Sequence, residues 1–208
     1  MRLVDYLIAT DGPPAPSGLA YDYVLARDGV YVQAENEYLA ARVPIAHCEV
    51  RGLRSLQPMC RLKHGRIAFG IWQHIVAVAQ VWALHRQEVL LTVRHDHRLG
   101  YHLVVPRQAT GETEIAYSPA PNVVLEIHSH HAYRARFSWV DDADEERLAL
   151  YGVVGRLDTE RPEVALRVGV YGYFMTVAWR DVFDEELEAF RDLADEPDEE
   201  GNDDGVPN

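Results

Sequence analysis

The sequence predicts an α+β (mixed α/β) protein in which one long helix leads into a mostly β core that carries another short helix. Short alternating or β-branched runs bounded by Gly, Pro and Asp recur along most of the chain and predict strands. Residues 67–86 instead repeat apolar side chains every three or four positions, which predicts a long amphipathic helix. The acidic start of residues 142–147 predicts a second, short helix, because negative charge is favourable at a helix N-terminus.

These elements divide the chain into three regions. Residues 1–62 predict a small β-rich N-terminal region, with a hairpin whose turn carries Asp28 and Gly29. Residues 63–183 hold the long helix and most strands and are expected to form the main domain. The expected strands of this domain are 88–95, 101–107, 114–119, 123–131, 148–157, 161–172 and 173–183. Residues 184–208 predict an acidic, disordered tail, because they offer too little apolar surface to offset the entropy of ordering.

Composition narrows the range of partners. The 208-residue chain has a formal net charge of −13, and residues 181–208 hold 13 of its 33 acidic side chains, so the rest is nearly neutral. A nucleic-acid partner is not expected, because phosphate binding needs a basic face. No apolar run is long enough for a membrane span, and the first residues lack a signal-peptide pattern. With Cys48 and Cys60 expected as reduced thiols, these features predict a cytoplasmic protein without a membrane partner.

One stretch carries residues suited to metal chemistry. His128 and His130 lie two apart at the end of an expected strand, so their side chains share one face. Ser138 follows His130 after seven residues, and Asp141 follows Ser138 after two. Two imidazoles and one carboxylate are three ligands that leave a fourth position open, which is the pattern of a catalytic zinc site. We therefore expect one Zn²⁺ per chain, bound by His128, His130 and Asp141.

Such a site also needs a proton acceptor for the attacking water. Glu88 is the favoured residue, because it lies where the long helix meets the first strand of the main domain. The alternatives are Glu126, whose ordinary role would be that of a solvent-facing strand carboxylate, and Glu35 or Glu37 in the N-terminal region. His131 is expected to be a solvent-facing neighbour of the ligands, with a substrate contact as its alternative role.

The spacing His-Ser-His, seven residues, Ser, two residues, Asp resembles the motif of the JAB/MPN (JAMM) metalloproteases over residues 66–180. The expected order of elements around it is also similar to that family, and the prokaryotic JAB branch is the more similar part of it. The resemblance implies a JAB/MPN-like sheet flanked by helices and zinc at His128, His130 and Asp141. It also implies that Glu88 is the general acid/base and that Ser138 stabilises the oxyanion. His131 stands where family members often have Pro, and residues 89–93 lack the usual glycines.

The resemblance implies a zinc isopeptidase or peptidase that cleaves after the C-terminal Gly of a ubiquitin-like protein. Activating or conjugating enzymes (E1- or E2-like proteins) of the same system would be further partners. Two alternatives remain. One is a peptidase that matures a sulfur-carrier protein, and the other is a metal-free MPN-type scaffold that only binds a partner protein.

Overall fold

The described part of the chain is mostly β-structure, with two mixed sheets and three short helices, so the predicted α+β class and the JAB/MPN-like fold that the resemblance implies are wrong. The computed structural model describes residues 2–110, 115–117, 122–187 and 189–195. Strands make up 41% of these residues and helices 15%, and the helices are short. The N-terminal region adds five strands and no helix, which tips the balance away from the predicted class.

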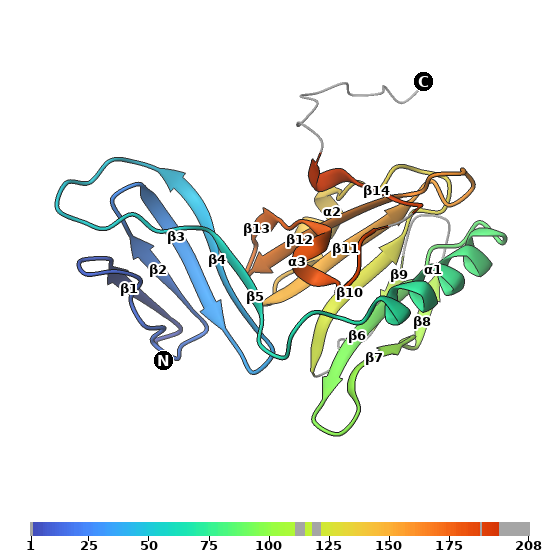
Figure 1. The fold of residues 1–208 in the computed structure, drawn as a ribbon, viewed down its shortest axis with the longest axis horizontal. Helices are drawn as coiled ribbons and strands as arrows, with labels where there is room; N and C mark the ends of the chain where they lie inside the picture. The colour runs from blue at the N-terminus through green and yellow to red at the C-terminus, as the bar shows by residue number, and fades with distance from the viewer. Residues whose placement is uncertain (1, 111–114, 118–121, 188, 196–208) are drawn as a thin grey trace.

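The first sheet is formed by the N-terminal region (Figure 1). Its strands follow one another in chain order, with β1 and β2 parallel and the other pairs antiparallel. The predicted hairpin at Asp28 and Gly29 is confirmed, since it joins β2 to β3. The five strands are β1 (Val4–Ile8), β2 (Tyr21–Leu25), β3 (Gly29–Glu35), β4 (Leu39–His47) and β5 (Met59–Leu62).

The second sheet is larger and mixed. Its order is β13-β12-β11-β10-β6-β7, and β14 pairs in parallel with β12. The pair β10–β11 is parallel, whereas β10–β6, β11–β12, β12–β13 and β6–β7 are antiparallel. The strands are β6 (Leu90–Asp96), β7 (Gly100–Val104), β10 (Val123–Ser129), β11 (Ala149–Gly155), β12 (Glu163–Val170), β13 (Tyr173–Thr176) and β14 (Arg191–Asp192). A separate hairpin pairs β8 (Gln108–Thr110) with β9 (Ile115–Tyr117).

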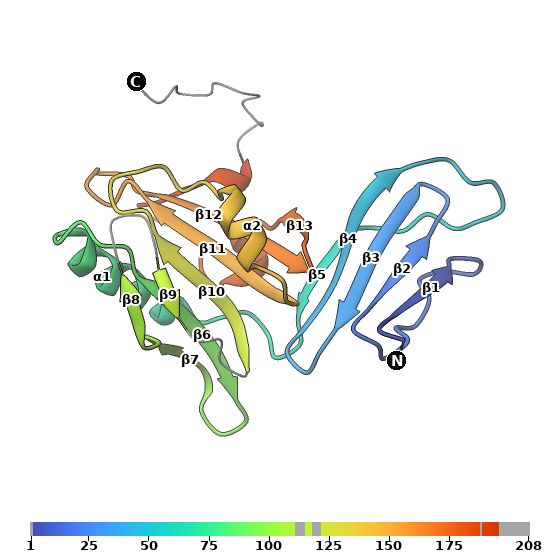
Figure 2. The same cartoon turned by 180° about the vertical axis from the view of Figure 1, so that it is seen from behind.

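The helices lie on both faces of this second sheet (Figures 1 and 2). Helix α1 (Phe69–Ala83) confirms the predicted long helix, and its buried stripe is Trp72, Ile75 and Ala79. The Trp72 ring packs at 4.7 Å, between ring centroids, against Trp179 of the short helix α3 (Trp179–Val182). The single strand expected over 173–183 is therefore split, because it ends at Thr176 and continues as α3. Helix α2 (Trp139–Asp144) lies on the opposite face.

One hydrophobic core connects the two sheets. Val32, Leu39 and Val43 of the first sheet belong to the same buried cluster as Val168 and Val170 of β12. The hydroxyls of Tyr23 and Tyr173 add a hydrogen bond of 2.7 Å between the sheets. The N-terminal region is thus packed against the main domain through both apolar and polar contacts.

The expected disorder of residues 184–208 is wrong for the first part of that segment. Phe190 is 9% exposed and packs on Trp72 with 5.0 Å between ring centroids. The Asp192 carboxylate accepts a hydrogen bond of 2.8 Å from the Trp179 backbone N–H, at the start of α3. Residues 196–208 lie outside the described residues. Within the described ranges, none of the helices combines the length and hydrophobicity that a membrane crossing requires.

Candidate metal centre

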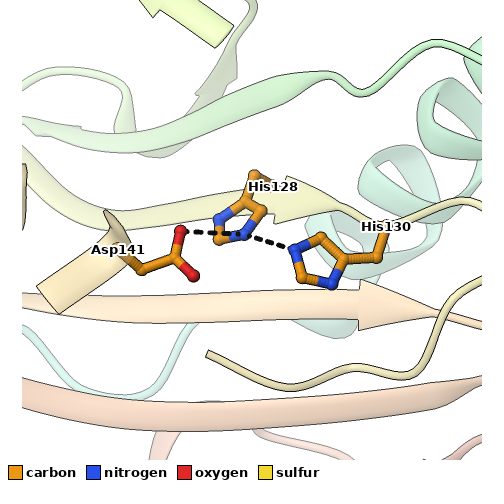
Figure 3. A group of neighbouring side chains, drawn as sticks. All are labelled: His128, His130 and Asp141. Atoms are coloured by element: carbon orange, nitrogen blue, oxygen red, sulfur yellow. Dashed lines mark hydrogen bonds and ion pairs between the residues drawn. The ribbon is translucent and has the colours of Figure 1, made fainter. Parts of the chain in front are cut away.

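The parallel pairing of β10 places both histidines beside β11. His128 is in register with Val153 of β11, and the His130 N–H continues the pairing by donating to the Val154 carbonyl at 2.7 Å. The two imidazoles lie on the face of the sheet that carries α2, and their Nε2 atoms are 3.1 Å apart (Figure 3). The alternation expected from the sequence therefore brings the two rings together.

Asp141 reaches the histidines from the first turn of α2. Ser138 is the N-cap residue, and Ser138 and Asp141 form a capping box. The Asp141 Oδ2 atom accepts from the Ser138 N–H at 2.6 Å and from the Ser138 hydroxyl at 2.8 Å. The other oxygen, Oδ1, is left to face the histidines and lies 3.4 Å from His128 Nε2 (Figure 3).

Three side-chain atoms of the kind that bind zinc lie close together in the structure. Ligand atoms of His128, His130 and Asp141 all lie within 4.8 Å of one another, and this is the only such group of three among the described residues. Four ligands at ~2.0–2.1 Å from a zinc ion are separated from each other by about 3.3 Å. The two separations that involve His128, 3.1 Å to His130 Nε2 and 3.4 Å to Asp141 Oδ1, are close to that value, and the third lies within 4.8 Å. The donor set therefore suits a zinc ion, with a shift of Asp141 or His130 needed to complete a tetrahedral arrangement.

The histidines are also in the right protonation state for metal binding. Burial lowers the pKa of His128 and of His130, the His130 imidazole lowers that of His128 further, and the His131 imidazole lowers that of His130 further. Both rings are thus neutral at pH 7, which is the form that binds a metal. His130 Nδ1 lies 3.0 Å from the Arg134 carbonyl oxygen. Because a carbonyl only accepts, Nδ1 carries the proton and Nε2 presents its lone pair to the site.

Glu88 stands next to this group, as the sequence predicts for the proton acceptor. The pairing of β10 with β6 matches His128 with Leu90, and mutual hydrogen bonds between Ser129 and Val89 extend it by one residue. Glu88 comes directly before Val89 in the chain, at the end of this pairing. Its side chain is 8% exposed. Burial and the negative charge of Asp141 raise the pKa of Glu88 to about 7, which indicates that the two carboxylates are within electrostatic range.

The alternative proton acceptors are engaged elsewhere. Glu126 is not the solvent-facing carboxylate that the sequence suggested, because it is 5% exposed and forms an ion pair with Arg147. Glu35 pairs with Lys63 at 2.9 Å within the first sheet region. Glu37 pairs with His97 at 2.6 Å. Geometry therefore favours Glu88 among the four carboxylates.

His131 departs from its predicted role. It was expected to face solvent, but it is 8% exposed, because the chain turns sharply after β10 and gives His131 a positive φ of 33°. His131 lines an open groove of about 740 Å³ whose lining includes none of the three ligands. The groove is bounded by the end of α1 and by the segment after β11, and includes Val81, Leu84, Tyr133 and Leu157. A sequence pattern of alternating faces does not apply where the strand has ended.

Ser138 has a different partner from the one that the resemblance implies. Its hydroxyl proton is directed to Asp141 Oδ2, at 2.8 Å. A hydroxyl carries a single proton, so while it donates to Asp141 it has none for a developing oxyanion. The arrangement supports a role in orienting the Asp141 ligand.

Two further residues near the centre were missed by sequence reasoning. Glu163 and Arg167 of β12 are 1% and 8% exposed, and both face the side of the sheet that carries the histidines. Their only sequence signal is a charge within an otherwise apolar strand, Glu163–Val170.

No protein-family model matches the chain, and no match is found among curated proteins. Function is therefore inferred from the geometry of the site.

We expect the chain to bind one zinc or cobalt ion with its two histidines and Asp141. In calorimetric titration of chelator-treated protein, the wild type should bind one equivalent, and His128→Ala should lose this binding because one of three ligands is removed. His74→Ala is the matched control, because His74 is exposed on α1. Unchanged stoichiometry and affinity in His128→Ala would show that the site is assigned to the wrong residues.

Ser138→Ala should weaken metal binding, because it removes the hydroxyl that orients Asp141. Loss of such an outer contact typically costs ~10–100-fold in metal affinity. The dissociation constant for zinc, measured by chelator competition, should rise by about this factor. A wild-type dissociation constant combined with a ~10²–10³-fold fall in kcat would instead support the oxyanion role and contradict the orienting one.

Proposed function

We propose that this protein is a zinc-dependent peptidase or isopeptidase, in which His128, His130 and Asp141 hold the metal and Glu88 transfers protons. The observation that carries the proposal is the convergence of two Nε2 atoms and one carboxylate oxygen beside a second, buried carboxylate. Three protein ligands leave a position open for water or substrate, which distinguishes a catalytic zinc site from a structural one.

The chemistry divides between the metal and Glu88. A zinc ion at this site would polarise the scissile carbonyl and activate a water molecule. Glu88 accepts a proton from the water as its oxygen attacks the carbonyl carbon. Glu88 then delivers that proton to the leaving nitrogen as the C–N bond breaks, so the carboxylate is regenerated. Burial is the larger cause of the raised pKa of Glu88 and acts with or without a metal, so this pKa is held closer to neutral pH, where the group accepts and releases a proton readily.

The substrate class is inferred from the resemblance of the motif to JAB/MPN metalloproteases. On that basis the scissile bond follows the C-terminal Gly of a ubiquitin-like protein in the cytoplasm, and E1- or E2-like proteins of the same system are further partners. Two surface features support a protein substrate. Trp139 and Val140, which directly precede the ligand Asp141, are 81% and 47% exposed. Tyr133, which follows the ligand His130 by three residues in the chain, is 61% exposed. Exposed apolar side chains next to a site mark protein contact surfaces.

Replacing Glu88 should separate catalysis from metal binding. Glu88→Gln keeps the size of the side chain but removes the proton acceptor, so turnover of a ubiquitin-like fusion cleaved after its terminal Gly should fall ~10²–10⁴-fold. Zinc content should stay at one per chain, because Glu88 is not proposed as a ligand. Turnover is followed by mass spectrometry of the cleaved fusion, and zinc by elemental analysis.

Glu35→Gln is the control, since it removes a carboxylate that pairs with Lys63 away from the site. It should leave turnover near the wild-type rate. If Glu88→Gln keeps more than about a tenth of wild-type turnover, Glu88 is not the base. If the wild type holds zinc but cleaves no such fusion, the substrate assignment is wrong. If it holds no metal, the peptidase proposal fails and the scaffold alternative is favoured.

A further inference from the structure

Strand β12 presents two buried charges to the metal centre although it is not adjacent to β10. His128 of β10 is in register with Val153 of β11, and Val153 is in register with Ala165 of β12. These three residues therefore form a row across one face of the sheet. Side chains two positions apart on a strand share a face, so Glu163 and Arg167 stand on this face, on either side of Ala165.

Arg167 fastens helix α2 to the sheet. Its Nε atom donates to Glu145 Oε2 at 2.7 Å, and its Nη1 atom donates to Asp142 Oδ1 at 2.6 Å. The guanidinium carbon also lies 3.8 Å from the ring centroid of Phe137 and 3.9 Å from that of Phe174. Charge-assisted hydrogen bonds and two aromatic contacts hold this side chain in a single position.

The anchored carboxylates belong to the residues around the ligand Asp141. Asp142 follows Asp141 directly, and Glu145 is the C-cap of α2, whose N–H donates to the Asp141 carbonyl at 3.0 Å. A six-residue helix is not stable by itself, so the position of α2 depends on its contacts with the sheet. Arg167 is the contact that reaches both Asp142 and Glu145. It thereby sets where Asp141 Oδ1 lies relative to the histidines.

Glu163 acts in a similar way on the loop after β10. The loop passes so close to β11 that a Cβ atom on Gly155 would lie 2.4 Å from the Tyr133 carbonyl oxygen. Glu163 Oε2 accepts from the Ala135 N–H at 3.2 Å and lies 3.6 Å from Arg134 Nε. Arg156 lies 3.2 Å from the other oxygen of Glu163 and offsets its buried charge.

This loop orients the second histidine ligand. The Arg134 carbonyl oxygen lies 3.0 Å from His130 Nδ1 and fixes the ring so that Nε2 faces the site. Glu163 holds Arg134 and Ala135, so it holds this carbonyl in place. The two charges of β12 thus support two different ligands, one through α2 and one through the loop.

We propose that Glu163 and Arg167 are positioning residues of the metal centre: Arg167 sets Asp141 through Asp142 and Glu145, and Glu163 sets His130 through the backbone of residues 134–135. The proposal rests on the proposed function in that it requires His128, His130 and Asp141 to bind a metal. It adds that the affinity of the site is set by a strand that contributes no ligand.

The test measures the affinity for zinc in variants that leave all three ligands intact. Arg167→Lys keeps the positive charge but loses the fixed fork of donors, and Glu163→Gln keeps the size but loses the charge. Each should raise the zinc dissociation constant ~10–100-fold, the range typical of outer contacts to metal ligands. Folding of the metal-free proteins is checked by circular dichroism and thermal unfolding.

A further variant, Asp142→Ala, tests the role of Arg167 if Arg167→Lys does not fold, and two control variants accompany it. The Asp142 side chain is 53% exposed, so Asp142→Ala should fold, yet it removes the Nη1 contact of Arg167. Its zinc dissociation constant should also rise. Asp144→Ala is the matched control, because Asp144 is an exposed acidic residue of the same helix and is not a partner of Arg167. Arg42→Lys is the control for a buried arginine, bonded to Gln33 in the first sheet. Both controls should bind zinc as the wild type does.

The outcomes separate this proposal from the proposed function. If the wild type binds zinc and both Arg167→Lys and Asp142→Ala bind it equally well, the role of Arg167 is overturned. The same result for Glu163→Gln overturns the role of Glu163 alone. If Asp144→Ala or Arg42→Lys weakens binding as much, the effect is general destabilisation and the proposal fails. If the wild type binds no metal, the proposed function fails first and this proposal with it.

Discussion

The parallel pairing of β10 with β11 is the constraint on which the candidate metal centre depends. Parallel neighbours cannot be joined by a tight turn and need a crossover connection. Here the crossover is residues 130–148, and it returns across the face of the sheet that carries His128. Ser138, Asp141, and the Arg134 carbonyl all belong to it. A hairpin at this point would have left the histidines without a carboxylate partner.

The same crossover explains why the centre needs support from β12. A connection of this length with only a six-residue helix has little stability of its own. Glu163 and Arg167 hold it at two points, and both of these side chains are nearly completely buried. Buried charges are costly unless they are paired, and each of them is paired with groups of the crossover. The contacts that neutralise the buried charges of Glu163 and Arg167 are therefore the same contacts that hold the crossover, and with it the ligands, in place.

Sequence reasoning was most successful where the signal is local. The spacing of His128, His130 and Asp141 reflects strand alternation and a helix cap, both of which are short-range, and the structure brings the three together. It failed where the outcome depends on long-range packing. The burial of Glu126 and the facing of Glu163 and Arg167 towards the site follow from strand register across β10, β11 and β12, whereas His131 is buried by the turn of the chain after β10. The α+β class is wrong because the many short strands, five of them in the N-terminal region, outweigh the helices, of which α1 is the longest described.

The most direct test of the account is anomalous diffraction at the zinc absorption edge from crystals grown with zinc. We expect one anomalous peak per chain, at ~2.0–2.2 Å from His128 Nε2, His130 Nε2 and Asp141 Oδ1, with Glu88 outside the coordination sphere and the Ser138 capping box intact. A peak bound by other residues, or one in which Glu88 replaces Asp141 as a ligand, would contradict the account.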